Sequence, residues 1–433
     1  MAAFITLFLF FVQFLCFQLS FSGVLSPVKH DHITRRFELT VHMKSPLQPT
    51  NLLLDLSAPL SWIDCTANDT SIPCNSLLCN TLTTTTSCSD GCSRPAAGPS
   101  CANASCHVIL ASPRRRRGVM VKALVEKLGL PATDGRNPGQ IRVIPEFVLS
   151  CSKRSAVRGI VPKRVTGLAA LGRSNFSLPA QFGAGSGSPN VFALCLSSSP
   201  SAPGVAFFGS PGPYNFFPEG DLSRHLNYTP LLPNPRNPTH KPSTEYFIGL
   251  NSIKVNGKTV VQLNRSRAGF GVAKFSLGAP YTVVESSIYK LLTEAFVNET
   301  NALKFTVTEP VKPFTVCYDE ADVWHTKTGP AAPVIDLVTH GEEKLWRIFG
   351  HNSMVRIPRS REGLELWCLG FVDGGVKPRW PVVIGWHQMV DNLLQFDLES
   401  ERLGFTSSVM VHNTMCANFN FTVNSGLTQS LVK

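Results

Sequence analysis

The sequence predicts a mainly β protein of two lobes with a few short helices. Most apolar residues fall in strand-length segments, many of which alternate with polar residues, and turn-forming residues separate these segments. Gly and Pro number 32 each and charged residues make up 16% of the chain, a composition typical of β-rich globular proteins. With 433 residues, the chain is longer than most single domains, which favours two.

The first 22 residues are an apolar run that ends in small residues, as signal peptides do, although the run lacks their basic start. A membrane anchor is the alternative interpretation, but no stop-transfer pattern follows. Cleavage would remove Cys16 and leave twelve of the 13 cysteines, an even number that suits six disulfides in an oxidising compartment. We therefore expect a secreted protein that has no contact with the membrane after cleavage.

Cysteines are dense in the first half of the chain, at Cys65, Cys74, Cys79, Cys88, Cys92, Cys101, Cys106 and Cys151. The spacing of Cys88 and Cys92 is compatible with zinc, but no second pair with histidines follows, so we expect disulfides and neither a metal nor another cofactor. Asn-x-Ser/Thr sequences mark sites of N-glycosylation in secreted proteins. They occur at Asn68, Asn103, Asn175, Asn227, Asn264, Asn298 and Asn420.

The net charge of +11 implies attraction to acidic surfaces. In an oxidising compartment these would be acidic proteins or acidic cell-wall polysaccharides, and we expect no nucleic-acid partner. Four consecutive arginines at 114–117 could suggest nucleic-acid binding or proteolytic processing. The flanking Pro113 and Gly118 favour a solvated basic loop instead.

Strands are expected where β-branched, aromatic or aliphatic residues are bounded by turn residues. They lie at 36–43, 51–57, 141–151, 190–196, 204–210, 246–257 and 393–405. The helical segments are 177–182 and 286–300, and Ser286 or Ser287 is expected to cap the second. The apolar face of that helix consists of Ile288, Leu291, Leu292, Ala295 and Phe296.

One pattern occurs in each half of the chain. In the first half, an apolar strand delivers Asp55 to a turn, and GLAALG follows at 167–172. In the second half, KFSLGAPYTVVESS at 274–287 is followed by VVIGW at 382–386. A strand and turn followed later by an apolar strand that ends in glycine, present twice, indicates two duplicated lobes.

Several long segments carry a resemblance to a known family, among them NLLLDLSAPLSWIDC at 51–65, PYTVVESSIYK at 280–290 and VVIGWHQMVDNLLQFDLESERLGF at 382–405. In these segments the chain resembles pepsin-like aspartic proteases over nearly its whole mature length. It is most similar to their plant branch of basic 7S globulins, extracellular dermal glycoproteins and xylanase inhibitors.

The resemblance implies a two-lobed pepsin-like fold in which both lobes are of the xylanase-inhibitor type. The N-terminal lobe is expected at 23–225 and the C-terminal lobe at 244–433. Residues 226–243 are rich in proline and are expected to connect the lobes.

Aspartic proteolysis needs two carboxylates that lie a hydrogen bond apart and share one proton. Asp55 supplies one, but the resemblance places Ser276 where the second would be, and a serine cannot share that proton. Leu56 and Ser57 replace the threonine and glycine of the first catalytic turn in the family. We therefore expect no peptide hydrolysis, and we expect Asp55 to accept hydrogen bonds within its own turn.

In the resembled branch, some members inhibit microbial glycoside hydrolases through loops of the second lobe, and others accumulate in seeds. By residue-by-residue comparison, Lys327 and Asn413 match two arginines of an endoglucanase inhibitor, and His412 matches the key histidine of a xylanase inhibitor. Lys327 keeps the charge of its counterpart but loses the bidentate geometry, whereas Asn413 loses the charge. Arg379 is a further candidate cation. The alternative interpretation of each is an ordinary surface residue.

The resemblance also implies the disulfides Cys317–Cys368 and Cys195–Cys416, with the eight cysteines from Cys65 to Cys151 paired among themselves. We expect a secreted, glycosylated, non-catalytic protein of the plant apoplast that inhibits microbial xylanases or xyloglucan-specific endoglucanases in defence. The alternatives are a basic seed globulin with a storage or ligand-binding role and, against the serine at 276, an active aspartic endopeptidase.

Overall fold

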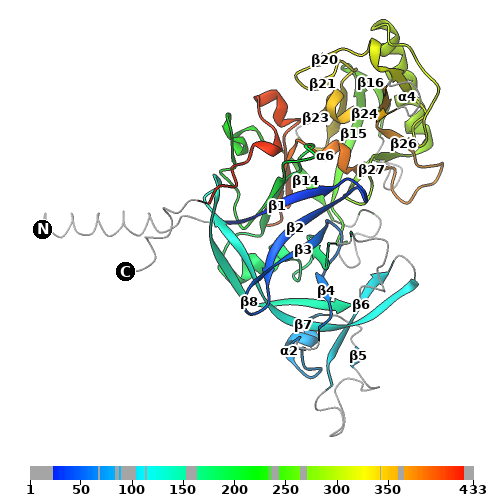
Figure 1. Ribbon diagram of the computed structural model, residues 1–433. Helices are drawn as coiled ribbons and strands as arrows, with labels where there is room; N and C mark the ends of the chain where they lie inside the picture. The colour runs from blue at the N-terminus through cyan, green and yellow to red at the C-terminus, as the bar shows by residue number, and fades with distance from the viewer. Residues whose placement is uncertain are drawn as a thin grey trace, which may run out of the picture.

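A computed structural model of the chain describes residues 23–66, 69–82, 87–88, 104–112, 115–152, 162, 164–233, 235, 243–263, 271–341, 343–358 and 365–423. Strands contain far more of these residues than helices do, and the helices are few and short, which confirms the predicted mainly β class. Figure 1 shows the blue and cyan strands of the first lobe on one side of β1 and the green to orange strands of the second lobe on the other. The expected signal peptide at 1–22 lies outside the described residues.

The elements of the first half are β1 Gly23–Asp31, β2 Arg36–Met43, β3 Gln48–Asp55, β4 Trp62–Asp64, α2 Leu77–Leu82, β5 Ser87–Cys88, β6 Cys106–Ser112, β7 Arg115–Thr133, β8 Pro138–Ser152, β9 Gly167–Ala170, α3 Leu178–Ser186, β10 Val191–Cys195, β11 Gly204–Phe208, β12 Asn215–Phe216, β13 Gly220–Asp221 and the 3-10 helix η4 Leu222–His225. Strands β6 and β7 pair antiparallel as a hairpin, and their sequence contains no tyrosine.

The elements of the second half are β14 Asn227–Leu232, β15 Phe247–Val255, β16 Lys258–Gln262, β17 Val272–Ser276, β18 Thr282–Val284, α4 Ser286–Ala302, β19 Cys317–Asp319, η5 Glu320–Asp322, β20 His325–Thr326, β21 Gly329–Pro330, β22 Ile335–Thr339, β23 Leu345–Ile348, α5 Gly350–Ser353, β24 Met354–Pro358, β25 Glu365–Leu369, β26 Phe371–Asp373, β27 Val382–Gly385, α6 Trp386–Met389, β28 Leu393–Asp397, β29 Arg402–Phe405, η6 Val409–His412 and η7 Cys416–Asn418.

The predicted strands are present, with one correction. Residues 393–405 form the antiparallel pair β28 and β29 rather than one strand, because the chain reverses at Glu401, whose φ is 49°. Residues 227–232 of the proline-rich segment form β14, which pairs with both β15 and β29.

The helix predictions also need correction. α3 continues to Ser186, and the cap of α4 is Glu285, whose carboxylate accepts hydrogen bonds from the N–H groups of Ser287 and Ile288. A carboxylate at this position satisfies free N–H groups and also complements the helix dipole, which a serine hydroxyl does not. Leu291, predicted on the buried face of α4, is 47% exposed.

The two lobes repeat one arrangement of strands. In the first, β3 and β9 are parallel, with Asp55 opposite Ala170. In the second, β17 and β27 are parallel, with Ser276 opposite Gly385. Strands β4 and β18 repeat as well, since each has one parallel partner (β8 or β26) and one antiparallel partner (β9 or β27). The predicted internal repeat is therefore real, and Asp55 and Ser276 occupy equivalent places in its two copies.

A sheet shared by both lobes joins them. Strand β10 of the first lobe pairs with β11 on one side and with β28 of the second lobe on the other. The rings of Phe192 and Phe396 stack across this junction, with centroids 4.6 Å apart, and Tyr246 packs 4.7 Å from Phe396. One apolar core therefore runs through both lobes, which fixes their relative position.

Four disulfides lie among the described residues. Cys317–Cys368 links two residues that face each other on β19 and β25, and Cys195–Cys416 links β10 to the C-terminal segment. These are the two pairs that the family resemblance implied. Cys65–Cys151 and Cys79–Cys106 lie within the cysteine-rich first half, where Cys74 is disulfide-bonded as well.

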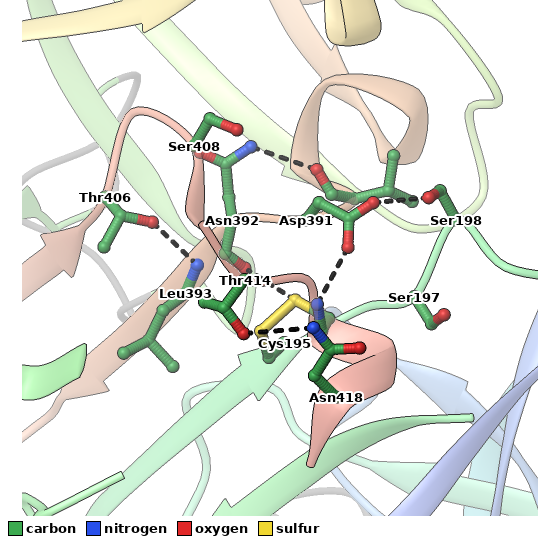
Figure 2. The surroundings of a disulfide bond; sticks show 12 residues. Cys195, Ser197, Ser198, Asp391, Asn392, Leu393, Thr406, Ser408, Thr414 and Asn418 are labelled. Carbon is green, nitrogen blue, oxygen red and sulfur yellow. Dashed lines mark hydrogen bonds between the residues drawn. A yellow bond between two sulfur atoms is a disulfide. The ribbon is translucent and has the colours of Figure 1, made fainter. Parts of the chain in front are cut away.

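A buried carboxylate stands beside the Cys195–Cys416 disulfide (Figure 2). The side chain of Asp391 has no solvent exposure and accepts hydrogen bonds from the backbone N–H of Cys416 at 2.9 Å, from the hydroxyl of Ser198, and from Nε2 of His351 at 3.0 Å. Its backbone carbonyl accepts the N–H of Val409 at 2.8 Å. Asp391 therefore ties residues 409–416 to the first lobe and to α5.

We expect Asp391→Asn to lower the free energy of unfolding by about 2–4 kcal/mol, because an amide nitrogen would face one of the donors and leave it unsatisfied. Denaturant unfolding at neutral pH measures the loss. Asp134→Asn is the control, since Asp134 is exposed, and it is expected to change the free energy of unfolding by less than about 0.5 kcal/mol. Equal stability of the two variants would contradict the supporting role of Asp391.

The fold also predicts a loss of stability in acid. His387 in α6 donates from Nε2 to the carbonyl of Met354 at 2.9 Å, and burial, reinforced by His351 nearby, lowers its pKa to about 4. The unfolded chain takes up a proton at this residue near pH 6.5, whereas the native state does so only near pH 4. Above about pH 6.5, protonation of His387 therefore does not lower the free energy of unfolding, and this free energy falls as the pH drops from there toward 4.

His387→Gln keeps a donor to Met354 but does not titrate, so we expect it to reduce this acid-induced loss by about 2 kcal/mol. Denaturant unfolding of both proteins at a series of pH values between about 7 and 4 measures the difference. Parallel stability curves for parent and variant would contradict the assignment.

Candidate functional site

The first repeat places Asp55 at the end of β3, where its carboxylate supports a turn. Oδ1 accepts hydrogen bonds from the N–H and the hydroxyl of Ser57, both at 2.7 Å, and from the N–H of Ala58 at 3.1 Å. Thr244, which precedes β15, donates to the carbonyl of Ser57 at 2.7 Å and so ties this turn to the second half of the chain.

The second repeat presents a hydroxyl at the equivalent place. Ser276 ends β17, and the guanidinium of Arg36 on β2 reaches across to donate to the carbonyl of Leu277 at 3.5 Å. Sequence reasoning did not select Arg36, because nothing in its own surroundings indicates this contact with the other lobe. At the two equivalent strand ends, this chain therefore has one carboxylate, one hydroxyl and a neighbouring guanidinium.

A pocket of about 460 Å³ lies beside Asp55. Its polar lining includes Asp55, Ser57 and Thr244. The rest is mainly apolar and includes Trp62, Val108, Ile109 and Phe176. Such a pocket suits an apolar group of modest size that ends in a hydrogen-bond donor or a cation.

The two loops predicted to carry the binding residues lie in contact. The first loop, residues 323–333, includes β20, β21 and the turn between them, and the second, residues 408–416, follows β29. Nζ of Lys327 in the first donates to the carbonyl of Val411 in the second at 2.7 Å. His412 ends η6, and Asn413 follows it in the left-handed conformation with φ 57°. Lys327, His412 and Asn413, called the loop group below, therefore form one surface.

The second loop is held at both ends. At its start, the hydroxyl of Ser408 accepts a hydrogen bond from the N–H of Met410 at 3.2 Å and caps η6. At its end, Cys416 forms a disulfide with Cys195 and donates its N–H to the carboxylate of Asp391 (Figure 2). Thr414 donates to the carbonyl of Phe217 at 2.6 Å. The loop is thus ordered before any partner arrives, which lowers the entropy lost on binding.

Two residues beside the loop group were missed by sequence reasoning. The ring of His225 stacks on that of His412 with centroids 3.7 Å apart, and its Nε2 lies 3.0 Å from Oε1 of Glu219. Burial lowers the pKa of His412. The nearby His225 and Lys327 lower this pKa further, whereas the carboxylate of Glu219 raises it. No local pattern could have identified these neighbours, because they reach His412 only through the packing of distant segments.

Arg379 is placed apart from the loop group. Its described contacts are with Glu245, at 3.8 Å, and with the ring of Trp380, 5.7 Å from the centroid. None of these contacts joins it to Lys327 or His412, so three of the four predicted residues come together and the fourth does not.

Exposed apolar side chains accompany the loop group. Trp324 in the first loop is 71% exposed, Phe217 is 77% exposed, and Val411 is 38% exposed. Exposed aromatic rings such as those of Trp324 and Phe217 are enriched at the centres of protein–protein interfaces, so they favour a protein partner at this surface.

The described glycosylation sequences suit the surface. The asparagines are exposed at Asn175, Asn227, Asn298 and Asn420, whereas Asn68, Asn103 and Asn264 lie outside the described residues. Among the residues that the structure describes, no helix has the length and apolar character needed to cross a membrane.

Comparison with known proteins agrees with this architecture. Residues 37–210 match the family model described as xylanase inhibitor N-terminal, and residues 245–407 match the one described as xylanase inhibitor C-terminal. The chain is 42% identical to a soybean (Glycine max) protein named probable aspartic proteinase GIP1, over 91% of each sequence.

Solved structures give the same result. The crystal structure of edgp matches with a TM-score of 0.82 and 37% identity over 93% of this chain and 98% of that one. Basic 7S globulin from soybean matches with a TM-score of 0.75 and 27% identity over 94% and 100%. An aspartic proteinase from Irpex lacteus, 13% identical with a TM-score of 0.53 over 90% and 98%, shares the fold alone. Because it has two duplicated β lobes and matches both domain models, the chain belongs to the xylanase-inhibitor family of proteins with the pepsin-like aspartic proteinase fold.

Proposed function

We propose that this protein is a secreted, non-catalytic inhibitor of microbial glycoside hydrolases that degrade plant cell walls, acting in the apoplast as part of plant defence. The target class is a xylanase or a xyloglucan-specific endoglucanase. The observation that carries the proposal is the contact between the two predicted loops, in which the ammonium of Lys327 lies on the carbonyl of Val411, next to His412.

The chemistry of the target fits this surface. A retaining glycosidase holds two carboxyl groups about 5 Å apart in a cleft, which creates a strong negative potential. The exposed ammonium of Lys327 and the ring nitrogens of His412 can form charge-assisted hydrogen bonds with such groups, and the exposed rings of Trp324 and Phe217 can cover the rim. The net charge of +11 favours encounter with acidic surfaces, including acidic cell-wall polysaccharides.

Secretion is part of the proposal. It is supported by the disulfides among the described residues and by the exposure of the described sequon asparagines. The apolar run at 1–22 would direct the chain to the secretory pathway.

The absence of proteolysis is proposed from the chemistry at Asp55 and Ser276. A single carboxylate opposite a hydroxyl cannot share the proton that the aspartic mechanism requires. This departs from the name of the soybean relative, which describes a probable aspartic proteinase.

A second candidate function is ligand binding or storage, as a basic globulin. The apolar pocket beside Asp55 favours it, because a pocket of this kind offers an apolar ligand burial and one polar anchor. Among the solved structures that match is basic 7S globulin from soybean, although that name states no ligand.

Titration against a panel of microbial xylanases and xyloglucan-active endoglucanases tests the inhibitor proposal. We expect inhibition of at least one enzyme, and we expect Lys327→Ala or His412→Ala to weaken it about 10- to 100-fold by removing a hydrogen bond to a target carboxylate. Lys377→Ala is the matched control, since Lys377 is an exposed lysine outside both loops, and its inhibition constant should equal that of the parent. If no panel enzyme is inhibited by micromolar protein, the globulin function replaces the inhibitor function.

Acid proteolysis is measured separately. The protein is expected to leave denatured haemoglobin intact at acid pH, with or without pepstatin, because Ser276 cannot supply the second carboxylate. An active pepsin-like protease assayed in parallel shows that the conditions support cleavage. Cleavage by this protein that pepstatin abolishes would show the non-catalytic assignment to be wrong.

A further inference from the structure

A cluster of possible metal ligands lies beside the loop group. One carboxylate oxygen of Glu219 and one ring nitrogen each of His225 and His412 all lie within 4.8 Å of one another. His225 Nε2 and Glu219 Oε1 are 3.0 Å apart. In a tetrahedral zinc site with bonds of about 2.0–2.1 Å, ligand atoms lie about 3.4 Å apart. The stacked rings of His225 and His412 would have to rotate out of their parallel arrangement to turn both nitrogens toward one ion.

The backbone that carries these ligands is fixed from several sides. Asp221 caps η4 by accepting the N–H of Ser223 and also accepts the N–H of Tyr214, both at 2.9 Å. The hydrogen bond from Thr414 to Phe217 joins the loop that carries His412 to the turn that carries Glu219. The three ligands are therefore brought together by the fold itself.

We infer that Glu219, His225 and His412 form a binding site for one Zn²⁺ ion. Two imidazoles and a carboxylate are ligands that zinc accepts, and imidazole in general suits zinc, copper and nickel rather than magnesium or calcium. Each of the three residues is partly exposed or exposed, so an ion can reach the site from solvent, and a water molecule can complete the coordination. The sequence predicted no metal, because Glu219 and His225 are far from His412 along the chain and show no spacing motif.

The positive charge of Lys327 would repel a zinc ion at this site, and the effect of removing this charge distinguishes Lys327 from the ligands. Nζ of Lys327 lies on the carbonyl of Val411, the residue before His412, and an ammonium repels a divalent cation. Its removal is expected to leave zinc binding as tight as in the parent or to strengthen it several-fold, whereas removal of a ligand must weaken binding.

The test is calorimetric titration of ZnCl₂ into the full-length mature protein, purified without a histidine tag and stripped with EDTA. We expect one equivalent to bind with micromolar affinity, and we expect His225→Ala, His412→Ala and Glu219→Gln each to weaken binding at least about 10-fold. His325→Ala is the matched control, because His325 is an exposed histidine outside the cluster, and its affinity should equal that of the parent. No binding, or equal binding by the parent and all ligand variants, would overturn the inference.

Two further measurements guard against misfolded variants. The thermal unfolding midpoint of each EDTA-stripped variant should match that of the parent, and zinc should raise the midpoint of the parent but not of the ligand variants, since only a native site binds the ion. Co²⁺ should give the parent the intense visible absorption of a four-coordinate site. A spectrum unchanged by His225→Ala and His412→Ala would also overturn the inference.

One consequence rests on the proposed function. A ring nitrogen of His412 that holds zinc cannot bond to a carboxylate of a target, so zinc should weaken glycosidase inhibition relative to EDTA. The calorimetric titration is carried out without a glycosidase, so a failure of the metal site can be told apart from a failure of the proposed function. Zinc binding without any inhibition would reject only the proposed function, and inhibition without zinc binding would reject only the metal site.

Discussion

The carboxylate of Asp391 holds together three parts of the molecule that the loop group needs in one place. It is buried, and its donors come from the first lobe (Ser198), from α5 (His351) and from the C-terminal segment (Cys416). A buried carboxylate is tolerated only where such donors satisfy it, and each donor fixes the position of the segment that supplies it. The residue itself has φ 49°, a conformation that the surrounding hydrogen bonds must maintain. The pairing of β10 with β28 sets up this arrangement, because Asp391 also donates its N–H to Leu196, directly after β10.

The duplicated architecture explains how the fold can persist without the catalytic pair. The ends of β3 and β17 are positioned by pairing with β9 and β27, which uses main-chain groups and not the side chains of Asp55 and Ser276. Replacement of a carboxylate by a hydroxyl at the second position therefore leaves the ladder of hydrogen bonds intact. Leu56 is 3% exposed and belongs to the main core, so the first turn contributes apolar packing at a position where the resembled proteases have a threonine. The side chains that catalysis would require can therefore change here while the strand pairing and the apolar packing are kept.

Sequence reasoning succeeded where the signal is local or repeated. Alternation predicted β2 and the duplicated pattern predicted two lobes, whereas the equivalence of Asp55 and Ser276 came from the family resemblance. It failed where the outcome depends on packing: the cap of α4 is Glu285 because its carboxylate, rather than a neighbouring hydroxyl, reaches the free N–H groups. The stacking of His225 on His412 could not be predicted, because it joins two 3-10 helices that are far apart in the sequence. The pairs Cys195–Cys416 and Cys317–Cys368 came from family resemblance, since spacing alone leaves the connectivity open.

The surroundings of the cations distinguish the loop group from other basic residues on the surface. Lys274 and Arg379 both lie against the carboxylate of Glu245, so their charge is already compensated within the molecule. The described polar contact of Lys327 is with the neutral carbonyl of Val411, which orients the ammonium without cancelling its charge. An external carboxylate that meets Lys327 therefore gains a full charge interaction, whereas one that meets Arg379 must compete with Glu245. His412 lies next to the contact of Lys327 with Val411 and within 4.8 Å of the carboxylate of Glu219, so the proposed anion contact and the proposed zinc site share this residue.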